Sequence, residues 1–215
     1  MIALILGATG ATGKDLTEQL LTDSDFSEVH IFVRRPLEIN NSKLRIHVVD
    51  FNNPKEWKNE VKGDVAFSCL GTTLKAAGSK ENQYKIDVDY QYNFAKSAKE
   101  NGVKNFILVS AFGANPKSSI FYNKMKGELE QKIENLHFQA ATFFKPGMLE
   151  RKNTDRKAET ISLKILSFAN AVGLFKNHQP LATSDLAKAM IKASKMNTEN
   201  LKKIELQEIR DFLTK

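Results

Sequence analysis

The chain has 215 residues, of which 41% are hydrophobic and 27% are charged, a composition typical of one globular domain and not of a disordered chain. Its single cysteine, Cys69, excludes an internal disulfide and a cysteine-based zinc site, and its four histidines lack the spacing of metal ligands. The net charge of +7 admits a nucleic acid, an acidic membrane surface or a small anionic ligand, but it comes entirely from residues 111–215, because residues 1–110 hold equal numbers of basic and acidic residues.

The sequence gives no sign of a membrane or of nucleic acid as a partner. No apolar run approaches the length of a membrane-spanning helix, and the first residues enter an apolar segment without a charged leader. No recognised nucleic-acid-binding motif accompanies the positive charge. We therefore expect a cytoplasmic protein, either a monomer or a homodimer, that binds neither a membrane nor a nucleic acid.

A glycine-rich loop lies between the first two predicted elements. Residues 1–6 form an apolar run that predicts a buried parallel strand, and residues 14–21 have the periodicity of a helix. Glycines let backbone amides approach a pyrophosphate closely, and the helix N-terminus adds partial positive charge. A tight turn without a ligand is the alternative. The predicted cofactor-binding residues of this loop are Gly7, Ala8, Thr9, Gly10, Ala11, Thr12 and Gly13.

The second predicted strand, at residues 29–33, ends in Arg34 and Arg35. An NAD-binding chain usually carries Asp or Glu here for the ribose 2′-hydroxyl, whereas arginine pairs with a 2′-phosphate. The pair therefore predicts NADP(H) over NAD(H), with two solvated arginines as the alternative. Asp50 and Phe51 follow the third strand, at residues 45–49, and are predicted to flank the adenine, although packing alone would also explain Phe51.

The middle of the chain continues the alternation of strands and helices. A fourth strand is predicted at residues 64–69, a long helix at 82–100 that Asn101 and Gly102 terminate, and a fifth strand at 105–110. Asp87 and Asp89 lie early in that helix. Their carboxylates can orient a water at the site, or they can simply complement the helix N-terminus.

Two Tyr-x-x-x-Lys pairs occur, Tyr92 with Lys96 and Tyr122 with Lys126. Residues four apart on a helix share one face, so the lysine cation can stabilise a tyrosinate that exchanges a proton with a substrate oxygen. Tyr92 lies in mid-helix and is predicted to pack against a neighbouring helix. Tyr122 instead opens the helix predicted at residues 122–135, shortly after the fifth strand ends at Ser110.

This placement predicts a catalytic set. The carboxyl ends of parallel strands form the ligand crevice of an α/β sheet. We therefore predict that Ser110, Tyr122 and Lys126 are catalytic, with Ser110 bonded to a substrate carbonyl and Tyr122 transferring the proton. A strand cap and a helix surface are the alternative roles.

The sixth strand, at residues 138–144, precedes Pro146 and Gly147. The whole pattern predicts an α/β fold, a Rossmann-like doubly wound parallel sheet with helices on both faces and a small C-terminal cap, in a single domain of residues 1–215. Residues 147–200 are expected to form the substrate side. Helices are predicted there at 161–174 and at 183–195, the second capped by Thr183 or Ser184, before a short strand at 203–206 and a terminal helix.

Basic residues outnumber acidic ones between Lys145 and Lys176. The excess suggests a mildly anionic substrate or an acidic partner on the substrate side, whereas a solvated lysine-rich surface is the simpler interpretation.

Taken together, these motifs resemble the short-chain dehydrogenase/reductase superfamily, and specifically its atypical NAD(P)-binding branch of Tat-interacting-protein-like oxidoreductases and NmrA-like proteins. The resemblance covers residues 1 to about 150. Its motifs are GATGATG at 7–13, VRR at 33–35, CLGTT at 69–73, IDVDY at 86–90, LVS at 108–110, YNKMKGE at 122–128 and KPG at 145–147.

The resemblance implies a Rossmann-like fold, NADP(H) as the cofactor and a Ser-Tyr-Lys catalytic set. It also implies that the stretch Cys69, Leu70, Gly71 and Thr72 runs along the cofactor, and that Pro146 and Gly147 pass near the nicotinamide.

Two positions depart from the pattern of the family, and they bear on its chemistry. Lys145 stands where relatives often carry arginine, and Asp87 stands where many carry a catalytic asparagine. The expected function is NADP(H)-dependent reduction of a small carbonyl compound. A regulatory NADP(H)-binding protein that acts through a protein partner is the alternative.

Overall fold

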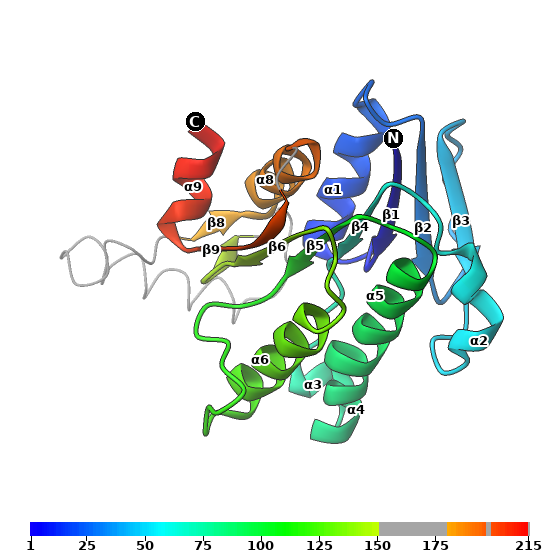
Figure 1. The fold of residues 1–215 in the computed structure, drawn as a ribbon. Helices are drawn as coiled ribbons and strands as arrows, with labels where there is room; N and C mark the ends of the chain where they lie inside the picture. Colours follow the sequence, from blue (N-terminus) through cyan, green and yellow to red (C-terminus); the bar gives the residue numbers. More distant parts are fainter. Residues whose placement is uncertain (151–179, 197–198, 215) are drawn as a thin grey trace.

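The computed structural model describes residues 1–150, 180–196 and 199–214, which contain a seven-stranded parallel sheet with helices on both faces (Figure 1). The strands lie in the order β3-β2-β1-β4-β5-β6-β9. Strands β2 and β3 are thus added on one side of β1, and β4 and the later strands on the other, so the strand order reverses between β1 and β4. This topology confirms the predicted Rossmann-like doubly wound fold. The strands are β1 (Ile2–Leu6), β2 (Glu28–Val33), β3 (Leu44–Val48), β4 (Val65–Ser68), β5 (Asn105–Val109), β6 (Ala140–Lys145) and β9 (Asn200–Glu205).

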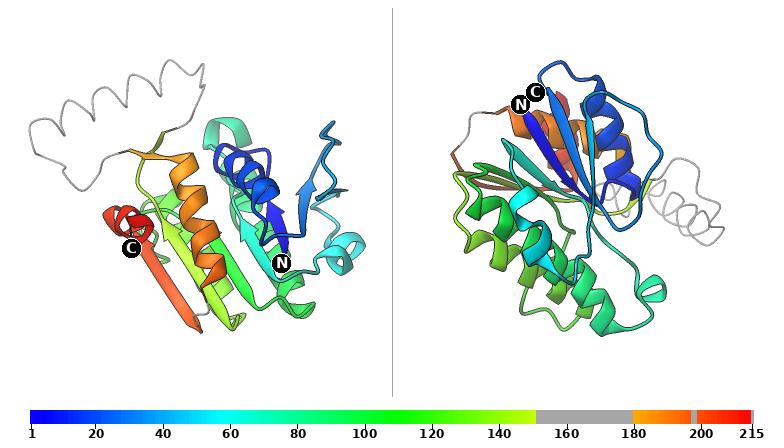
Figure 2. Two further views of the ribbon diagram at one scale, coloured as in Figure 1. Left: turned by 90° about the horizontal axis from the view of Figure 1, so that it is seen from above. Right: turned by 90° about the vertical axis from the view of Figure 1, so that its right-hand side faces the viewer.

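The helices fall into two layers, one on each face of the sheet (Figure 2). The first layer holds α1 (Ala11–Thr22), α8 (Thr183–Lys195) and α9 (Gln207–Thr214), and the second holds α5 (Tyr90–Glu100) and α6 (Phe121–Glu134). The shorter elements are α2 (Pro54–Trp57), a 3₁₀ turn (Lys58–Glu60), α3 (Leu74–Ala77), α4 (Lys80–Tyr84), β7 (Leu149–Glu150) and β8 (Leu181–Ala182).

Each layer buries its own core against the sheet. Successive side chains of β1 alternate between the cores, since Ile5 packs with α1 and α8 while Leu4 and Leu6 pack with α5 and α6. All of these side chains are fully buried. Burial on both faces explains why the central strands are continuous apolar runs in the sequence.

The helix predicted at residues 82–100 is present but not continuous. It consists of α4, a π-helical segment at Lys85–Asp89, and α5. Its predicted termination is confirmed, because Gly102 adopts a positive φ of 84° after Asn101. Wider turns of this kind often occur at functional sites, and this one contains the buried Asp87.

The predicted cap of the helix at residues 183–195 is wrong, although the bounds of the helix agree. Ala182 occupies the N-cap position and makes no side-chain cap hydrogen bond. The Thr183 hydroxyl instead donates to Asp15 Oδ2 of α1 at 2.6 Å. Thr183 therefore links two neighbouring helices. The helix predicted at residues 161–174 lies outside the described residues.

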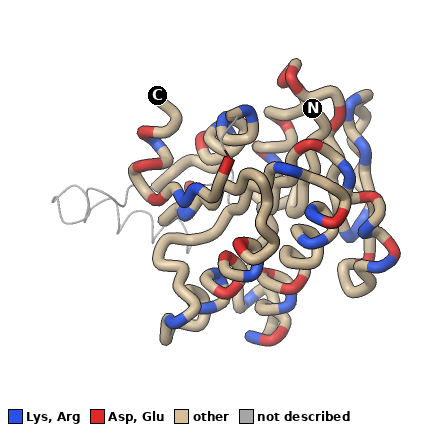
Figure 3. The backbone as a smooth tube through the Cα atoms, in the orientation of Figure 1, with Lys and Arg blue, Asp and Glu red and all other residues tan. Residues whose placement is uncertain are grey.

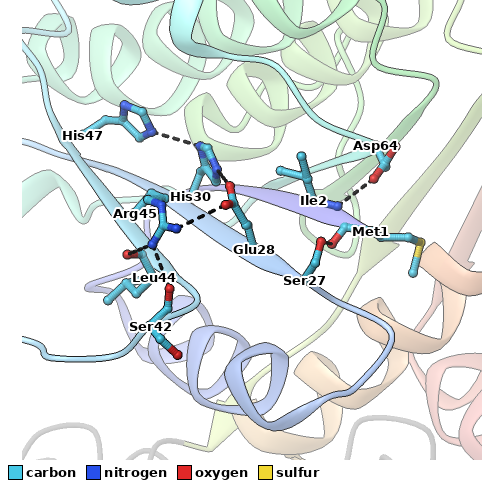
Figure 4. A network of polar contacts seen from close by, with 10 residues as sticks. All are labelled: Met1, Ile2, Ser27, Glu28, His30, Ser42, Leu44, Arg45, His47 and Asp64. Carbon is cyan, nitrogen blue, oxygen red and sulfur yellow. Dashed lines mark hydrogen bonds and ion pairs between the residues drawn. The ribbon is translucent and has the colours of Figure 1, made fainter.

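Polar contacts hold together the first three strands (Figure 4). His30 Nδ1 lies 3.0 Å from His47 Nε2, and His30 Nε2 lies 2.8 Å from Glu28 Oε2. The other carboxylate oxygen of Glu28, Oε1, accepts a hydrogen bond from Arg45. Burial, together with the neighbouring His30, lowers the pKa of His47. These histidines bond to strand neighbours. Among the described residues, no group of three or more metal-binding side chains occurs.

Charged side chains of both signs are interspersed along the described part of the chain (Figure 3). Several lysines of the second half of the sequence pair with carboxylates. Lys195 lies 2.6 Å from both Asp23 and Asp25, and Lys203 lies 2.6 Å from Glu134. Part of the positive charge noted in the sequence is therefore neutralised locally.

Candidate functional site

A cavity of about 550 Å³ opens at the carboxyl ends of the central strands. It lies where the strand order reverses, the usual ligand position in an open α/β sheet. Loops that follow four strands and the first two turns of α6 line it. The predicted site residues that it brings together are Gly10, Ala11, Thr12, Cys69, Leu70, Gly71, Thr72, Ser110, Tyr122, Lys126, Pro146 and Gly147.

The glycine loop is packed too closely to tolerate side chains at two of its positions. Gly7 has a positive φ of 88°, and a Cβ there would lie 2.5 Å from the backbone nitrogen of Leu70. A Cβ at Gly13 would lie 2.1 Å from the carbonyl oxygen of Gly7. The loop therefore lies directly on the chain after β4, and the free amides of the first turn of α1 begin at the cavity. Such a cradle fits a pyrophosphate group.

A second, smaller cavity of about 190 Å³ continues from the first. The two share the lining residues Leu70, Gly71 and Thr72, so one elongated ligand can occupy both. Arg34 and Phe51, two of the residues predicted to bind the cofactor, line the smaller cavity. The two cavities in line fit a dinucleotide.

The residues predicted around this smaller cavity differ in their placement. Arg34 is exposed at its edge, and no described carboxylate forms an ion pair with it. Phe51 is buried, and its ring centroid lies 5.4 Å from that of Tyr90. Arg35 and Asp50 line neither cavity, and the Asp50 carboxylate accepts hydrogen bonds from the residues of its own turn.

Tyr122 and Lys126 both line the cavity, but in very different surroundings. Tyr122 opens α6 and is 41% exposed, and its hydroxyl has no hydrogen-bond partner in the described part of the chain. Lys126, one turn later, is only 3% exposed, and its Nζ lies 3.3 Å from Asp87 Oδ1. The arrangement leaves the tyrosine hydroxyl free to meet a ligand, while the lysine is held in place by an ion pair.

Asp87 is the site residue whose role the sequence did not resolve. Its carboxyl group is 1% exposed, and Oδ2 accepts from the Thr72 backbone N–H at 2.9 Å. Oδ1 is the only buried side-chain oxygen or nitrogen of the described residues without a hydrogen bond. Burial raises the pKa of Asp87, although Lys126 and the Thr72 amide act in the opposite direction.

Ser110 contacts a residue that the sequence analysis missed. Its buried hydroxyl donates a short hydrogen bond to Glu130 Oε1 of α6. Glu130 Oε2 lies 3.8 Å from Lys145 Nζ and 3.6 Å from Lys203 Nζ. Burial raises the pKa of Glu130, whereas Ser110 and the two lysines act to lower it. Glu130 follows Lys126 by one helical turn, so its place on the face of the site residues was a signal available in the sequence.

A close approach of the loop after β5 fixes the position of α6. A Cβ at Gly127 would lie 2.3 Å from both Asn115 and Pro116 backbone atoms. Only glycine allows the loop to cross the helix at this distance. The crossing holds the start of α6, and with it Tyr122, at the mouth of the cavity.

The second Tyr-x-x-x-Lys pair and the cysteine have structural surroundings. The Lys132 ammonium of α6 lies 5.1 Å from the centre of the Tyr92 ring, which confirms that Tyr92 packs against a neighbouring helix. Burial raises the pKa of the Cys69 thiol to about 12. Of the basic stretch, Lys145 is buried beside Glu205 at 2.7 Å, and residues 151–179 lie outside the described part of the chain.

Comparisons with known proteins agree with this geometry. A family described as NAD(P)H-binding matches residues 7–193. The mitochondrial protein FMP52 of Candida albicans is 34% identical over 198 residues, covering 89% of this chain and 86% of that protein. The rat protein HTATIP2 is 40% identical over 149 residues, covering 67% of this chain and 61% of its own length.

Solved structures share the fold at low sequence identity. The UDP-glucose 4-epimerase of Thermotoga maritima superposes with a TM-score of 0.73 at 13% identity, covering 96% of this chain and 76% of that one. A short-chain dehydrogenase family protein of Francisella tularensis gives a TM-score of 0.65 at 17% identity, covering 97% and 98% of the two chains.

The expected cytoplasmic location is corrected by these relatives. The FMP52 proteins of Candida albicans, Eremothecium gossypii and Saccharomyces cerevisiae are all named as mitochondrial. Their names point to the mitochondrion instead of the cytoplasm. Within the described ranges, none of the helices has both the length and the apolar character needed to span a membrane.

Proposed function

We propose that this chain, which belongs to the NAD(P)H-binding family and is related to the short-chain dehydrogenases/reductases, is an NADP(H)-dependent oxidoreductase that reduces a small carbonyl compound. The observation that carries the proposal is the composition of one cavity. The end of the glycine loop, Ser110, Tyr122 and Lys126 all line it, although they come from three separate segments of the chain.

The choice of NADP(H) depends on Arg34. This side chain is exposed at the edge of the smaller cavity, beside the aromatic residues Phe51 and Tyr90. A guanidinium group that pairs with none of the described carboxylates is suited to a phosphate group, because it offers planar paired donors and a permanent charge. Within the described part of the chain, no carboxylate lines that cavity to bind a free ribose 2′-hydroxyl.

The residues of the cavity divide the chemistry between them. Bound NADPH supplies the hydride. The exposed hydroxyl of Tyr122 gives a proton to the carbonyl oxygen, and the Lys126 cation stabilises the tyrosinate that remains. Ser110 holds the same oxygen at the end of β5. Asp87 holds the buried Lys126 in place through an ion pair.

Turnover by purified protein with NADPH and a panel of small aldehydes and ketones tests the proposal. Tyr122→Phe keeps the ring and removes the acid, so kcat/KM should fall by about 10²–10⁴-fold. Tyr92→Phe is the matched control, because it changes the other Tyr-x-x-x-Lys pair, whose ring packs against Lys132. Unchanged turnover in Tyr122→Phe would remove tyrosine from the mechanism.

A second candidate function rests on the state of the catalytic set. The Ser110 hydrogen is engaged with Glu130, and Tyr122 has no described partner, so the groups are not assembled around one point before a ligand binds. This suits a regulatory NADP(H)-binding protein that acts through a protein partner. Tight NADPH binding without turnover of any carbonyl, together with a partner whose binding depends on NADPH, would favour it.

A further inference from the structure

The hydrogen bond of Ser110 conflicts with the role that the reaction requires of it. A hydroxyl group has one hydrogen to donate, and here that hydrogen goes to Glu130 Oε1. Ser110 therefore presents only its lone pairs to the cavity. A carbonyl oxygen is an acceptor, so Ser110 can bind it only if its hydrogen turns away from Glu130.

The surroundings of Glu130 decide whether this can happen. Its neighbours are Ser110 directly after β5, Lys145 on β6, Lys203 on β9 and Glu134 on its own helix. Both lysines lie beyond hydrogen-bond distance, at 3.8 and 3.6 Å, and each has a closer carboxylate. Lys145 is 2.7 Å from Glu205, and Lys203 is 2.6 Å from Glu134.

Ser110 is thus the one described hydrogen-bond donor to the Glu130 side chain. A protonated Glu130 needs no donor, because its own O–H can donate to the Ser110 oxygen. The pKa of Glu130 is raised by burial, which makes that protonated form accessible, while Ser110, Lys145 and Lys203 oppose it.

We propose that Glu130 is a positioning residue that sets the direction of the Ser110 hydroxyl. When Glu130 carries a proton, it donates to Ser110, and Ser110 donates to the substrate oxygen. When Glu130 is ionised, Ser110 donates to it and offers the cavity only an acceptor. The role rests on the proposed carbonyl reduction. Binding a carbonyl to the ionised protein then takes up one proton from solvent onto Glu130, and no covalent bond to carbon or oxygen changes.

The pH dependence of reduction tests this role, with NADPH and 4-nitrobenzaldehyde as the carbonyl probe. In the wild-type protein, kcat/KM should fall by about tenfold per pH unit above the titration of Glu130. Glu130→Gln keeps a donor for Ser110 at every pH, so this alkaline limb, the fall of kcat/KM at high pH, should vanish while reduction persists. The same limb in Glu130→Gln, or in Ser110→Ala, would overturn the proposal.

Glu134→Gln is the matched control. It removes a carboxylate of the same cluster that makes no contact with Ser110, so the limb should remain. Because the charge of Glu134 helps to raise the pKa of Glu130, the limb should move to lower pH. If the limb disappeared in Glu134→Gln, the pH dependence would belong to the charged cluster as a whole, and the specific role of Glu130 would be overturned.

A measurement without cofactor or substrate separates this proposal from the proposed function. Carbon-13 NMR of the carboxyl groups, with Glu130 assigned by its absence in Glu130→Gln, reports its titration. Ser110→Ala removes a hydrogen bond that favours the ionised carboxylate, so the pKa of Glu130 should rise. If the Glu130→Gln protein does not fold, loss of the pH limb in Ser110→Ala is the test of turnover, and the carboxyl resonance whose pKa rises in Ser110→Ala is assigned to Glu130.

The outcomes are distinct. If the pKa of Glu130 rises in Ser110→Ala but the wild-type protein reduces no carbonyl, the proposed function is refuted and the coupling between Glu130 and Ser110 stands. If the protein reduces carbonyls, but Ser110→Ala leaves the pKa of Glu130 unchanged and the fall of kcat/KM at high pH persists in Glu130→Gln, the coupling is refuted and the proposed function stands.

Discussion

The buried pair of Asp87 and Lys126 allows a stability prediction with a definite size. Both side chains are almost fully buried, at 1% and 4% exposure, with 3.3 Å between Oδ1 and Nζ. Exposed ion pairs contribute about 0–1 kcal/mol, but removal of one partner from a buried pair costs about 3–5 kcal/mol, because a charge stays behind without compensation. Asp87→Ala also leaves the Thr72 amide without its acceptor. We expect a loss of about 3–5 kcal/mol in the free energy of unfolding.

Urea unfolding followed by circular dichroism measures this loss, provided that the transition is two-state. Asp89→Ala is the matched control, since Asp89 is a half-buried carboxylate of the same π-helical segment and no ion pair joins it to a described residue. It should cost less than about 1 kcal/mol.

A double variant isolates the coupling. Asp87→Ala with Lys126→Met removes the stranded charge and should recover part of the stability that Asp87→Ala loses. A loss below about 1 kcal/mol for Asp87→Ala, or single losses that simply add in the double variant, would refute the interpretation of the pair as a buried, coupled unit.

Three further changes have defined outcomes. Gly13→Ala puts a Cβ 2.1 Å from the Gly7 carbonyl oxygen, so it should lower both the melting temperature and the affinity for NADPH, the latter by at least about tenfold by calorimetry. Arg34→Ala should lower the affinity for NADPH by about 10–100-fold and leave the affinity for NADH unchanged. Arg35 lies outside both cavities, so Arg35→Ala should change neither affinity. Equal effects of the two variants would contradict the role of Arg34 in binding the 2′-phosphate. Burial raises the pKa of Cys69 to about 12, so the thiol stays neutral at pH 8, and the stabilisation from this neutral form is lost only as the pH rises above about 9 towards 12. Mass spectrometry should show Cys69 alkylated by iodoacetamide about 10²–10³-fold more slowly in folded protein than in urea, because little of the half-exposed thiol is ionised, and equal labelling rates would contradict the raised pKa.

The parts of the fold that were predictable from the sequence are those that depend on near neighbours in the chain. An apolar run followed by glycines specifies both β1 and the start of α1, because the turn between them needs Gly7 at positive φ. In the same way, a Tyr-x-x-x-Lys pair at the start of α6 specifies which residues share a helix face.

The contacts that complete the site were not predictable, because they join residues far apart in the sequence. Glu130 has the features of a surface glutamate in an amphipathic helix until β5 brings Ser110 against it. The carboxylate of Asp87 reaches Lys126 from the π-helical segment at Lys85–Asp89, and a regular helical pattern gives no sign of that segment or of the contact. The hydroxyl of Thr183 has the features of a cap, but it donates to the Asp15 carboxylate on α1, far away in the sequence.

Strand β9 is synthesised after the other strands of the sheet, and it supplies charged contacts near the candidate site. It pairs with β6 across register partners that include Phe143 with Lys203 and Lys145 with Glu205, although more than fifty residues separate the two strands. A chain emerging from the ribosome amino end first can assemble the sheet from β3 to β6 before β9 exists. Until β9 docks, Glu130 lacks Lys203, and Lys145 lacks its closest carboxylate. The electrostatic surroundings of Ser110 are therefore completed last, so that a nascent chain can hold its nucleotide cradle before its reaction centre is finished.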